Sequence, residues 1–136
     1  MSRSGYIDDC CIEDYLAYGR WRGQVSNSIR SKRGQEFLKE LAAEMDAMSV
    51  KELIANELID ERGNCCAIGV ICKKRGLDVS GVDVTDRDKV GALVGIGAPM
   101  AAEIEYVNDE DIEDDPAERW RVVRRWVDMH IEKARQ

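Results

Sequence analysis

A single, mainly α-helical domain is the fold that this 136-residue sequence predicts. Two prolines and one phenylalanine, among many Ala, Glu, Arg and Leu residues, favour helices over sheets. Several stretches also begin and end with residues that cap helices. We expect about five to seven helices in one compact domain over residues 1–136, packed around a short buried central helix. Residues 1–11 are expected to be loosely held, and residues 57–66 have room for one small β-hairpin.

The first helical region covers residues 12–29, where apolar residues recur at helical spacing. Gly19 and Gly23 weaken it, so two short helices with a joint are expected. An amphipathic helix follows over residues 34–48, with charges opposite its apolar stripe. That stripe consists of Phe37, Leu38, Leu41, Met45 and Met48. Next, Ser49-Val-Lys-Glu52 has the capping-box pattern and predicts a short helix that carries Leu53 and Ile54.

The central helix is predicted within residues 64–76, where six uncharged residues precede three basic ones. The basic residues suit the last turn of a helix, Gly76 can end it in the left-handed conformation, and Leu77 supplies the usual apolar contact. Gly69 inside the run is tolerated if a neighbouring backbone approaches closely there. A buried strand is the alternative interpretation, because short apolar runs suit both structures.

Three further helix starts follow. Thr85-Asp-Arg-Asp88 has the capping-box pattern and begins a helix that ends at Gly95. Pro99 opens the next helix. Asp115-Pro-Ala-Glu118 is the clearest start in the chain, since it combines a cap, a first-turn proline and an acidic third residue.

The last helix, from Asp115 onwards, is apolar around most of its circumference and is expected to be wedged between neighbours. Its charged residues share one arc; they are Arg121, Arg124, Arg125, Asp128, Glu132 and Arg135. His130, the only histidine, is interpreted as a core-edge residue with its hydrogen bonds satisfied, because the sequence places no partner base or nucleophile near it.

The cysteines are expected to be buried, reduced thiols that act as small hydrophobic residues. There are five, at positions 10, 11, 65, 66 and 72, an odd number that argues against a disulfide framework. A zinc site built from Cys10 or Cys11 with Cys65, Cys66 and Cys72 is the alternative, although the spacing is not that of a known ligand pair. Otherwise no cofactor or metal is predicted. The N-terminus lacks the apolar core of a signal peptide and no apolar segment approaches membrane-spanning length, so we expect a cytoplasmic protein.

Charge is distributed unevenly along the chain, whose net charge is −7. Residues 19–39 carry six basic residues against one acidic, which gives +5, and residues 103–118 carry nine acidic residues and no basic one. The acidic stretch has two interpretations. One is a solvated loop that leads into the negatively charged start of the last helix. The other is a docking site for a basic surface, on which carboxylates imitate phosphates. The candidate contacts are Asp109, Glu110, Asp111, Glu113, Asp114, Asp115 and Glu118.

The basic stretch suggests an alternative function, nucleic-acid binding. The candidate contacts are Arg20, Trp21, Arg22, Arg30, Lys32 and Arg33, in which a tryptophan beside two arginines could stack on bases. A pI near 4.8 weakens this interpretation, unless the charges segregate to opposite faces. The basic residues could equally close on the acidic residues of the same chain. No catalytic motif is recognised, and the Gly-x-x-x-Gly-x-Gly of residues 91–97 is better explained as a helix end, so an enzyme is not predicted.

The sequence carries a series of short motifs: Cys66-Ala-Ile-Gly-Val-Ile-Cys72, Gly95-Ile96, Glu103-Ile-Glu-Tyr106, Asn108-Asp109, Glu118-Arg-Trp120 and Trp126-Val127, with Arg33-Gly-Gln-x-Phe-Leu upstream. Together they resemble a group of small, uncharacterised phage and prophage proteins. That group carries a Cys-Ala-Leu-Gly or Cys-Cys-Leu-Gly-Val-Leu-Cys core and a downstream Asn-Asp. The resemblance covers roughly residues 30–127 and implies a phage-accessory setting, without a mechanism.

Together, charge and resemblance predict a non-enzymatic protein in the cytoplasm of a bacterial host. It would bind, and inhibit, a host or bacterial-defence protein whose surface is basic and could itself bind nucleic acid. Nucleic-acid binding through the basic stretch is the second hypothesis, and a thiol- or zinc-dependent protein is the third. The partner's identity and the oligomeric state do not follow from the sequence.

Overall fold

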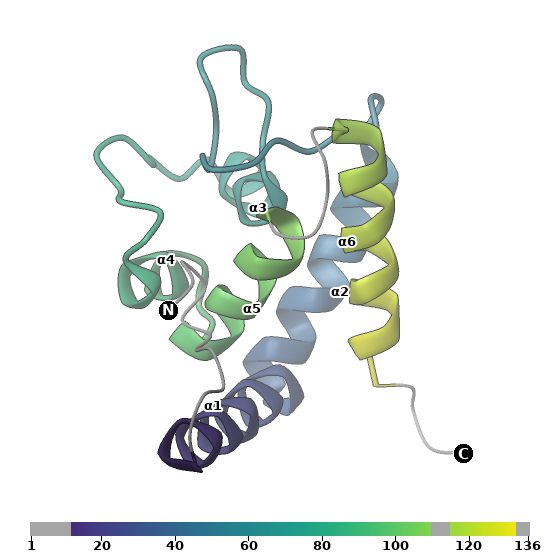
Figure 1. Cartoon of the computed structure of the whole chain (residues 1–136). Coiled ribbons are helices and arrows are strands. Elements are labelled where there is room, and N and C mark those ends of the chain that lie inside the picture. Colours follow the sequence, from purple (N-terminus) through teal and green to yellow (C-terminus); the bar gives the residue numbers. More distant parts are fainter. Residues whose placement is uncertain (1–11, 110–114, 133–136) are drawn as a thin grey trace.

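Helix α5 (Ala98–Asp109) packs against four others: α1 (Ile12–Arg30), α3 (Ala67–Arg75), α4 (Arg87–Val94) and α6 (Pro116–His130) (Figure 1). The remaining helix, α2 (Lys32–Ala47), lies beside α6 and also contacts α1 and α3. The computed structural model describes residues 12–109 and 115–132, with backbone only for residues 12–15. Within these residues the predicted all-α architecture is confirmed.

The predicted hairpin near residues 57–66 is present only in a minimal form. Ile59 and Cys65 form an isolated antiparallel bridge, and the described residues contain no strand. The Asp60 carboxylate shapes the turn by accepting hydrogen bonds from the backbone N–H groups of Arg62 and Asn64, each at 2.9 Å. This turn brings Leu58 back beside the start of α3, where the Cys66 N–H donates to the Leu58 carbonyl at 3.0 Å.

Helix α3 is buried, as the uncharged run predicts, with all six residues from Ala67 to Cys72 in the core. A β-carbon on Gly69 would overlap the Leu58 carbonyl oxygen, so the close backbone approach expected at this glycine is present. The helix ends as predicted: Gly76 is left-handed, with φ of 66°, and the Leu77 N–H donates to the Cys72 carbonyl at 2.9 Å.

The first helical region is one continuous helix, so the predicted joint at Gly19 and Gly23 is wrong. Two exposed glycines lower helix propensity without breaking a helix that packs along α5. The break lies at Ser31 instead, whose hydroxyl accepts from the Gly34 N–H at 3.0 Å and so caps α2. A β-carbon on Gly34 would collide with the carbonyls of Ser28 and Ile29, so glycine lets the two helices cross closely there.

The predicted short helix after Ser49 is also wrong, because residues 49–54 form an irregular, non-helical stretch. Its backbone is paired with distant parts of the chain. The Leu53 N–H donates to the Pro116 carbonyl at 3.1 Å, and the Ile54 N–H donates to the Cys65 carbonyl at 3.0 Å. These tertiary hydrogen bonds satisfy the groups that a helix would have satisfied, and they override the local capping pattern.

The later helices follow their end signals closely. Helix α4 is capped by Asp86, one residue after the predicted Thr85, and ends at the left-handed Gly95. Helix α6 begins as predicted, with the Asp115 carboxylate accepting from the Glu118 N–H at 3.1 Å and Pro116 in the first turn. As expected for a helix wedged between neighbours, α6 packs on both α2 and α5, although one of its apolar residues, Met129, is 71% exposed.

Candidate functional site

A buried asparagine fixes the end of α5. The Asn108 side chain is 2% exposed, and its Oδ1 accepts from the Ala67 N–H at 3.1 Å. Its Nδ2 donates to the Ile54 carbonyl at 2.9 Å and to Asp109 Oδ1 at 2.7 Å. A buried amide is stable only when its donors and acceptors are paired. Asn108 therefore ties the end of α5 to the start of α3 and to the irregular stretch before the turn.

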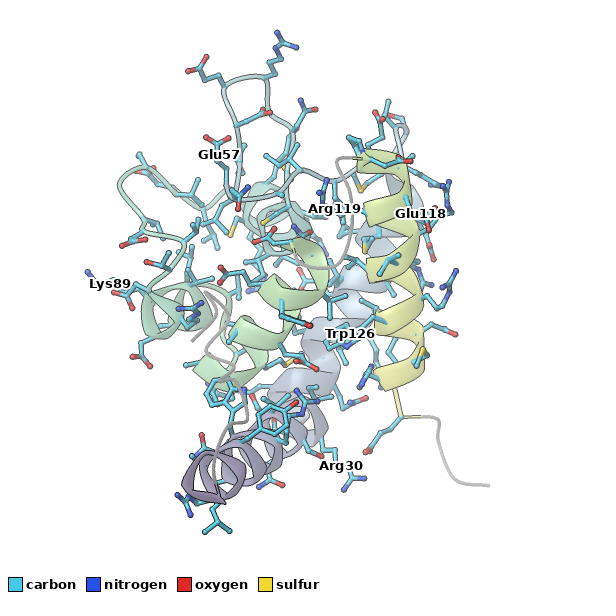
Figure 2. The ribbon with its side chains drawn as sticks, viewed as in Figure 1. Arg30, Glu57, Lys89, Glu118, Arg119 and Trp126 are labelled. Carbon is cyan, nitrogen blue, oxygen red and sulfur yellow. The ribbon has the colours of Figure 1, made fainter. Side chains whose placement is uncertain are left out.

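A buried arginine fixes the start of α6. Arg119 is 3% exposed and lies between α6 and α5 (Figure 2). Its Nε donates to the Asn108 carbonyl at 2.7 Å, and its Nη1 donates to the Leu53 carbonyl at 3.3 Å. We call Asn108 and Arg119, with the backbone groups that they bind, the Asn108–Arg119 cluster. Within it, a hydrogen bond joins the two helices directly.

The cluster lies at the base of the acidic segment, defined as residues 109–118. Asn108 immediately precedes this segment and Arg119 immediately follows it, so the hydrogen bond between them closes the segment into a loop. Glu110, Asp111, Glu113 and Asp114 lie outside the described residues. In sequence, these four carboxylates lie between two ends that are held together by buried hydrogen bonds.

The described members of the acidic segment each have a local structural contact. Asp109 is half-buried and accepts from the backbone N–H of Asn56 at 3.3 Å. Asp115 caps α6, and Glu118 accepts from Arg121 Nε at 2.9 Å. Asp109 and Asp115 therefore stabilise the ends of the segment, and the four acidic residues between them are the better candidates for partner contacts.

Two other acidic residues of the same charge-rich stretch pair within the protein. Glu103 is 6% exposed and accepts from both terminal nitrogens of Arg22, at 2.9 and 3.2 Å. Burial raises the pKa of Glu103 to about 7, and the opposing effect of Arg22 is partly screened because its side chain is 40% exposed. Glu105 lies 3.6 Å from Arg87. Through Arg22, the basic stretch thus closes in part on an acidic residue of its own chain, whereas Arg87 lies outside that stretch.

Of the six residues predicted to contact nucleic acid, two are packed or paired within the protein and four are exposed. Trp21 packs against the core and Arg22 pairs with Glu103, so neither projects freely into solvent. The exposed members are Arg20, Arg30, Lys32 and Arg33. Three of these lie at the junction of α1 and α2, and Arg20 lies ten residues before Arg30, about 15 Å along the helix. Trp21 is half-buried against the core and Arg22 is paired, so the structure does not bring the six candidates together on one exposed surface.

Acidic and basic residues occupy opposite ends of α6, as Glu118 and Arg30 show in Figure 2. The acidic segment leads into the start of α6, whereas the α1–α2 junction is bound to its other end. There, Gln35 Nε2 donates to the His130 carbonyl at 3.0 Å, and Gln35 Oε1 accepts from the Glu132 N–H at 2.8 Å. Fifteen residues of helix separate the two ends by about 22 Å. We call them the acidic end and the basic end.

The described cysteines are free and buried. Desolvation raises the pKa of Cys66 to about 12 and that of Cys72 to about 11, and it also raises the pKa of Cys65. The Cys66 sulfur accepts from the Gly69 N–H at 3.4 Å and caps α3. Within residues 12–109 and 115–132, no group of three His, Cys, Asp or Glu side chains is placed to hold a metal ion. Cys10 and Cys11, which belong to the zinc alternative, lie outside that range.

His130 has the contacts expected of a core-edge histidine. Its ring stacks on Trp126 with centroids 4.5 Å apart, and Nδ1 lies 2.8 Å from the Trp126 carbonyl oxygen. The backbone carbonyl of His130 accepts from Gln35, as described above. The ring therefore helps to fix the last turn of α6 at the basic end.

Comparisons with family models, curated proteins and solved structures find no match to this chain. Among the described helices, none is by itself long and apolar enough to span a membrane. Helices α4 and α5 reach that length and apolarity only when taken together, and they are bent by 100° relative to each other.

Sequence reasoning missed the Asn108–Arg119 cluster. No structural role is predicted for Arg119 from the sequence, although it lies four, seven and eight residues before Val123, Trp126 and Val127. Those three residues are buried on one face of α6, and Arg119 continues that face. This helical spacing is the signal that could have identified it. For Asn108 the only signal was its place in the motif shared with the phage proteins.

Proposed function

We propose that this protein acts by binding a basic surface of another macromolecule through its acidic segment. The contacts are assigned to Glu110, Asp111, Glu113 and Asp114, with Asp109, Asp115 and Glu118 at the margins. The observation that carries the proposal is the Asn108–Arg119 cluster, which holds both ends of the segment in place.

Burying an asparagine and an arginine is costly unless their polar atoms are hydrogen-bonded, and here the bonds that offset the cost lie at the base of the acidic segment. Both side chains bind backbone carbonyls or N–H groups at the base of the acidic segment. A loop whose ends are fixed loses less conformational entropy when it binds than a free tail does. The two fixed ends therefore support a binding role for the acidic segment over one that only keeps the protein soluble.

Charge distribution supports the same conclusion. Four carboxylates in five residues create a strong local negative potential, which steers basic partners and accelerates their association. The basic end lies about 22 Å away along α6, well beyond the screening length of about 8 Å at physiological ionic strength. The exposed basic residues of the basic end therefore do little to neutralise the acidic segment, and Arg121 pairs with Glu118 at its margin. A nucleic-acid-binding surface of another protein has the charge that fits it.

The setting of the proposal comes from the resemblance to small phage proteins. In that setting, the natural partner is a protein of the bacterial host or of its defence systems, and binding would inhibit it. Asn108-Asp109 and Glu118-Arg-Trp120, two motifs of the resemblance, supply residues of the cluster and of the segment ends. The anti-defence role is the most specific part of the proposal and rests on this resemblance alone.

Reversing Glu110, Asp111, Glu113 and Asp114 to lysine tests the proposal, because the residues that hold the segment ends remain. A matched control reverses four exposed acidic residues elsewhere, Glu36, Glu52, Glu61 and Asp88. Each variant has a net charge of −7 + 8 = +1. The wild type and the control should retain the same proteins from a bacterial lysate, and added salt should release them. The proposal is wrong if the acidic-segment variant retains those proteins equally well.

A second function, nucleic-acid binding at the basic end, is favoured by one observation. Arg30, Lys32 and Arg33 are exposed at the α1–α2 junction. A nucleic acid bound there would lie far enough from the acidic segment for its repulsion to be screened. With few phosphate contacts and Trp21 packed inward, binding should be weak and independent of sequence. A gel-shift titration at low salt should show binding that disappears when these three residues are changed to alanine. An unshifted band for the wild type would remove this candidate.

A further inference from the structure

A surface groove lies between the stretch that precedes the 60–64 turn and the loop that connects α3 to α4, both of which extend from the same side of the molecule (Figure 1). Its volume is about 340 Å³. Eight residues line it: Asn56, Glu57, Leu58, Ile59, Val79, Val82, Asp83 and Val84. Five of the eight are aliphatic, and none is basic.

The groove is continuous with the base of the acidic segment. A smaller cavity of about 20 Å³, room for about one water molecule, adjoins it and is also lined by Asn56, Glu57, Leu58 and Val84. This cavity extends to Asp109. The groove therefore lies close to Asp109, the first residue of the acidic segment.

Asn56 lies at the junction between the two. It has a φ of 70°, the only positive value among the described non-glycine residues, and its N–H donates to the Asp109 carboxylate at 3.3 Å. Asparagine tolerates this left-handed conformation better than most residues, but the conformation still costs energy. Strained backbone of this kind is concentrated at functional sites.

We infer that the groove binds an extended segment of the partner protein in which basic and aliphatic side chains alternate. The aliphatic side chains would contact Val79, Val82 and Val84, which are only partly buried. The basic side chains would pair with the exposed carboxylates of Glu57 and Asp83. Alternation follows from extended geometry, because successive side chains of a strand point to opposite sides.

This inference rests on the proposed function, because the same partner would contact the acidic segment beside the groove. Two blocked synthetic peptides of equal charge separate the two ideas: Lys-Leu-Lys-Leu-Lys and Lys-Gly-Lys-Gly-Lys. Each is titrated into isotope-labelled full-length protein, and backbone amide signals are followed by NMR. Both peptides should shift signals of the acidic segment. Only the leucine peptide should also shift residues 56–59 and 79–84, and it should bind about five-fold tighter, a gain of about 1 kcal/mol from partial leucine burial.

A charge reversal at the groove sharpens the test. Glu57→Lys should weaken binding of the leucine peptide about five-fold. Glu61→Lys is the matched control, because Glu61 is exposed on the adjoining turn but does not line the groove, and it should change binding about two-fold or less. Both positions are exposed, so both variants should fold.

The outcomes are distinguishable. Equal affinity of the two peptides, with shifts confined to the acidic segment, overturns the groove inference and leaves the proposed function standing. An equal loss of leucine-peptide binding in Glu57→Lys and Glu61→Lys also overturns it. If neither peptide shifts any signal, the groove inference and the proposed function both fail.

Discussion

The two ends of α6 are built differently, although each connects α6 to a charged region. At the acidic end, buried side chains bind backbone groups: Asn108 and Arg119 carry the hydrogen bonds. At the basic end, two helices cross at Gly34 with their backbones almost in contact, and half-buried Gln35 joins them to α6. Hydrogen-bonded buried polar groups fix the backbone groups that they bind. The fold therefore fixes the two ends of the acidic segment, whereas the basic residues lie on the exposed surface of α1 and α2.

Thiol labelling should show the largest difference between the ends. Cys66 lies beside Ala67, whose N–H binds Asn108, so its labelling requires the acidic end to open. In a Cys10→Ser, Cys11→Ser background at about pH 8, Cys66 and Cys72 should react with iodoacetamide at least about 1000-fold more slowly than in denaturant. The reason is that burial excludes the reagent, and their raised pKa values leave little thiolate. Arg33→Cys, exposed at the basic end, is the internal control and should react fast. Rapid labelling of Cys66 would mean that the acidic end is open.

Arg119→Met should destabilise the protein by about 3 kcal/mol. Methionine replaces most of the apolar part of the arginine side chain, but it leaves the buried carbonyls of Asn108 and Leu53 without their hydrogen-bond donor. Arg125→Met, an exposed position on the same helix, should stay within about 0.5 kcal/mol of the wild type. The free energy of unfolding in urea measures both. Equal effects of the two substitutions would show that the Asn108–Arg119 cluster does not stabilise the acidic end.

Gly34→Ala should destabilise the basic end by about 2 kcal/mol, because the added methyl group would force the backbones of α1 and α2 apart. Gly23→Ala is the matched control within α1. Nothing lies within 4 Å of a β-carbon there, so it should raise stability by about 0.5–1 kcal/mol through helix propensity. Thermal unfolding of the two variants measures the contrast. A stable Gly34→Ala protein would contradict the close helix crossing.

The smallest predicted effect concerns Glu103, which joins α5 to Arg22 of α1 between the two ends. Its pKa is raised to about 7 in the folded protein, so between about pH 4.5 and 7 the folded state binds more protons than the unfolded state. Stability should therefore fall as the pH rises through this window, by an amount on the order of 1 kcal/mol. Glu103→Gln should flatten that slope, whereas Glu36→Gln, at an exposed site, should keep it. An unchanged slope in Glu103→Gln would show that this carboxyl is not the titrating group.

Local signals predicted much of this fold. Features that depend on residues close in sequence lie where they were expected. They are the helix start at Asp115-Pro116, the helix ends at Gly76 and Gly95, and the uncharged helix α3. The helix predicted after Ser49 is absent for a tertiary reason, since the backbone N–H groups of Leu53 and Ile54 bind carbonyls more than ten residues away. The same holds for the site. Composition located the acidic segment, and helical spacing places Arg119 on the buried face of α6. The groups that Asn108 and Arg119 bind come from other helices and loops, which no local pattern encodes.

Reversing the charge of one end at a time tests the central claim most directly. One variant carries lysine at Glu110, Asp111, Glu113 and Asp114, and the other carries glutamate at Arg20, Arg30, Lys32 and Arg33. Each is immobilised and exposed to the same bacterial lysate beside the wild type, and the retained proteins are compared by mass spectrometry. We predict that the proteins held by the wild type are lost on reversal of the acidic end and kept on reversal of the basic end. The opposite pattern, loss only when the basic end is reversed, would contradict the account.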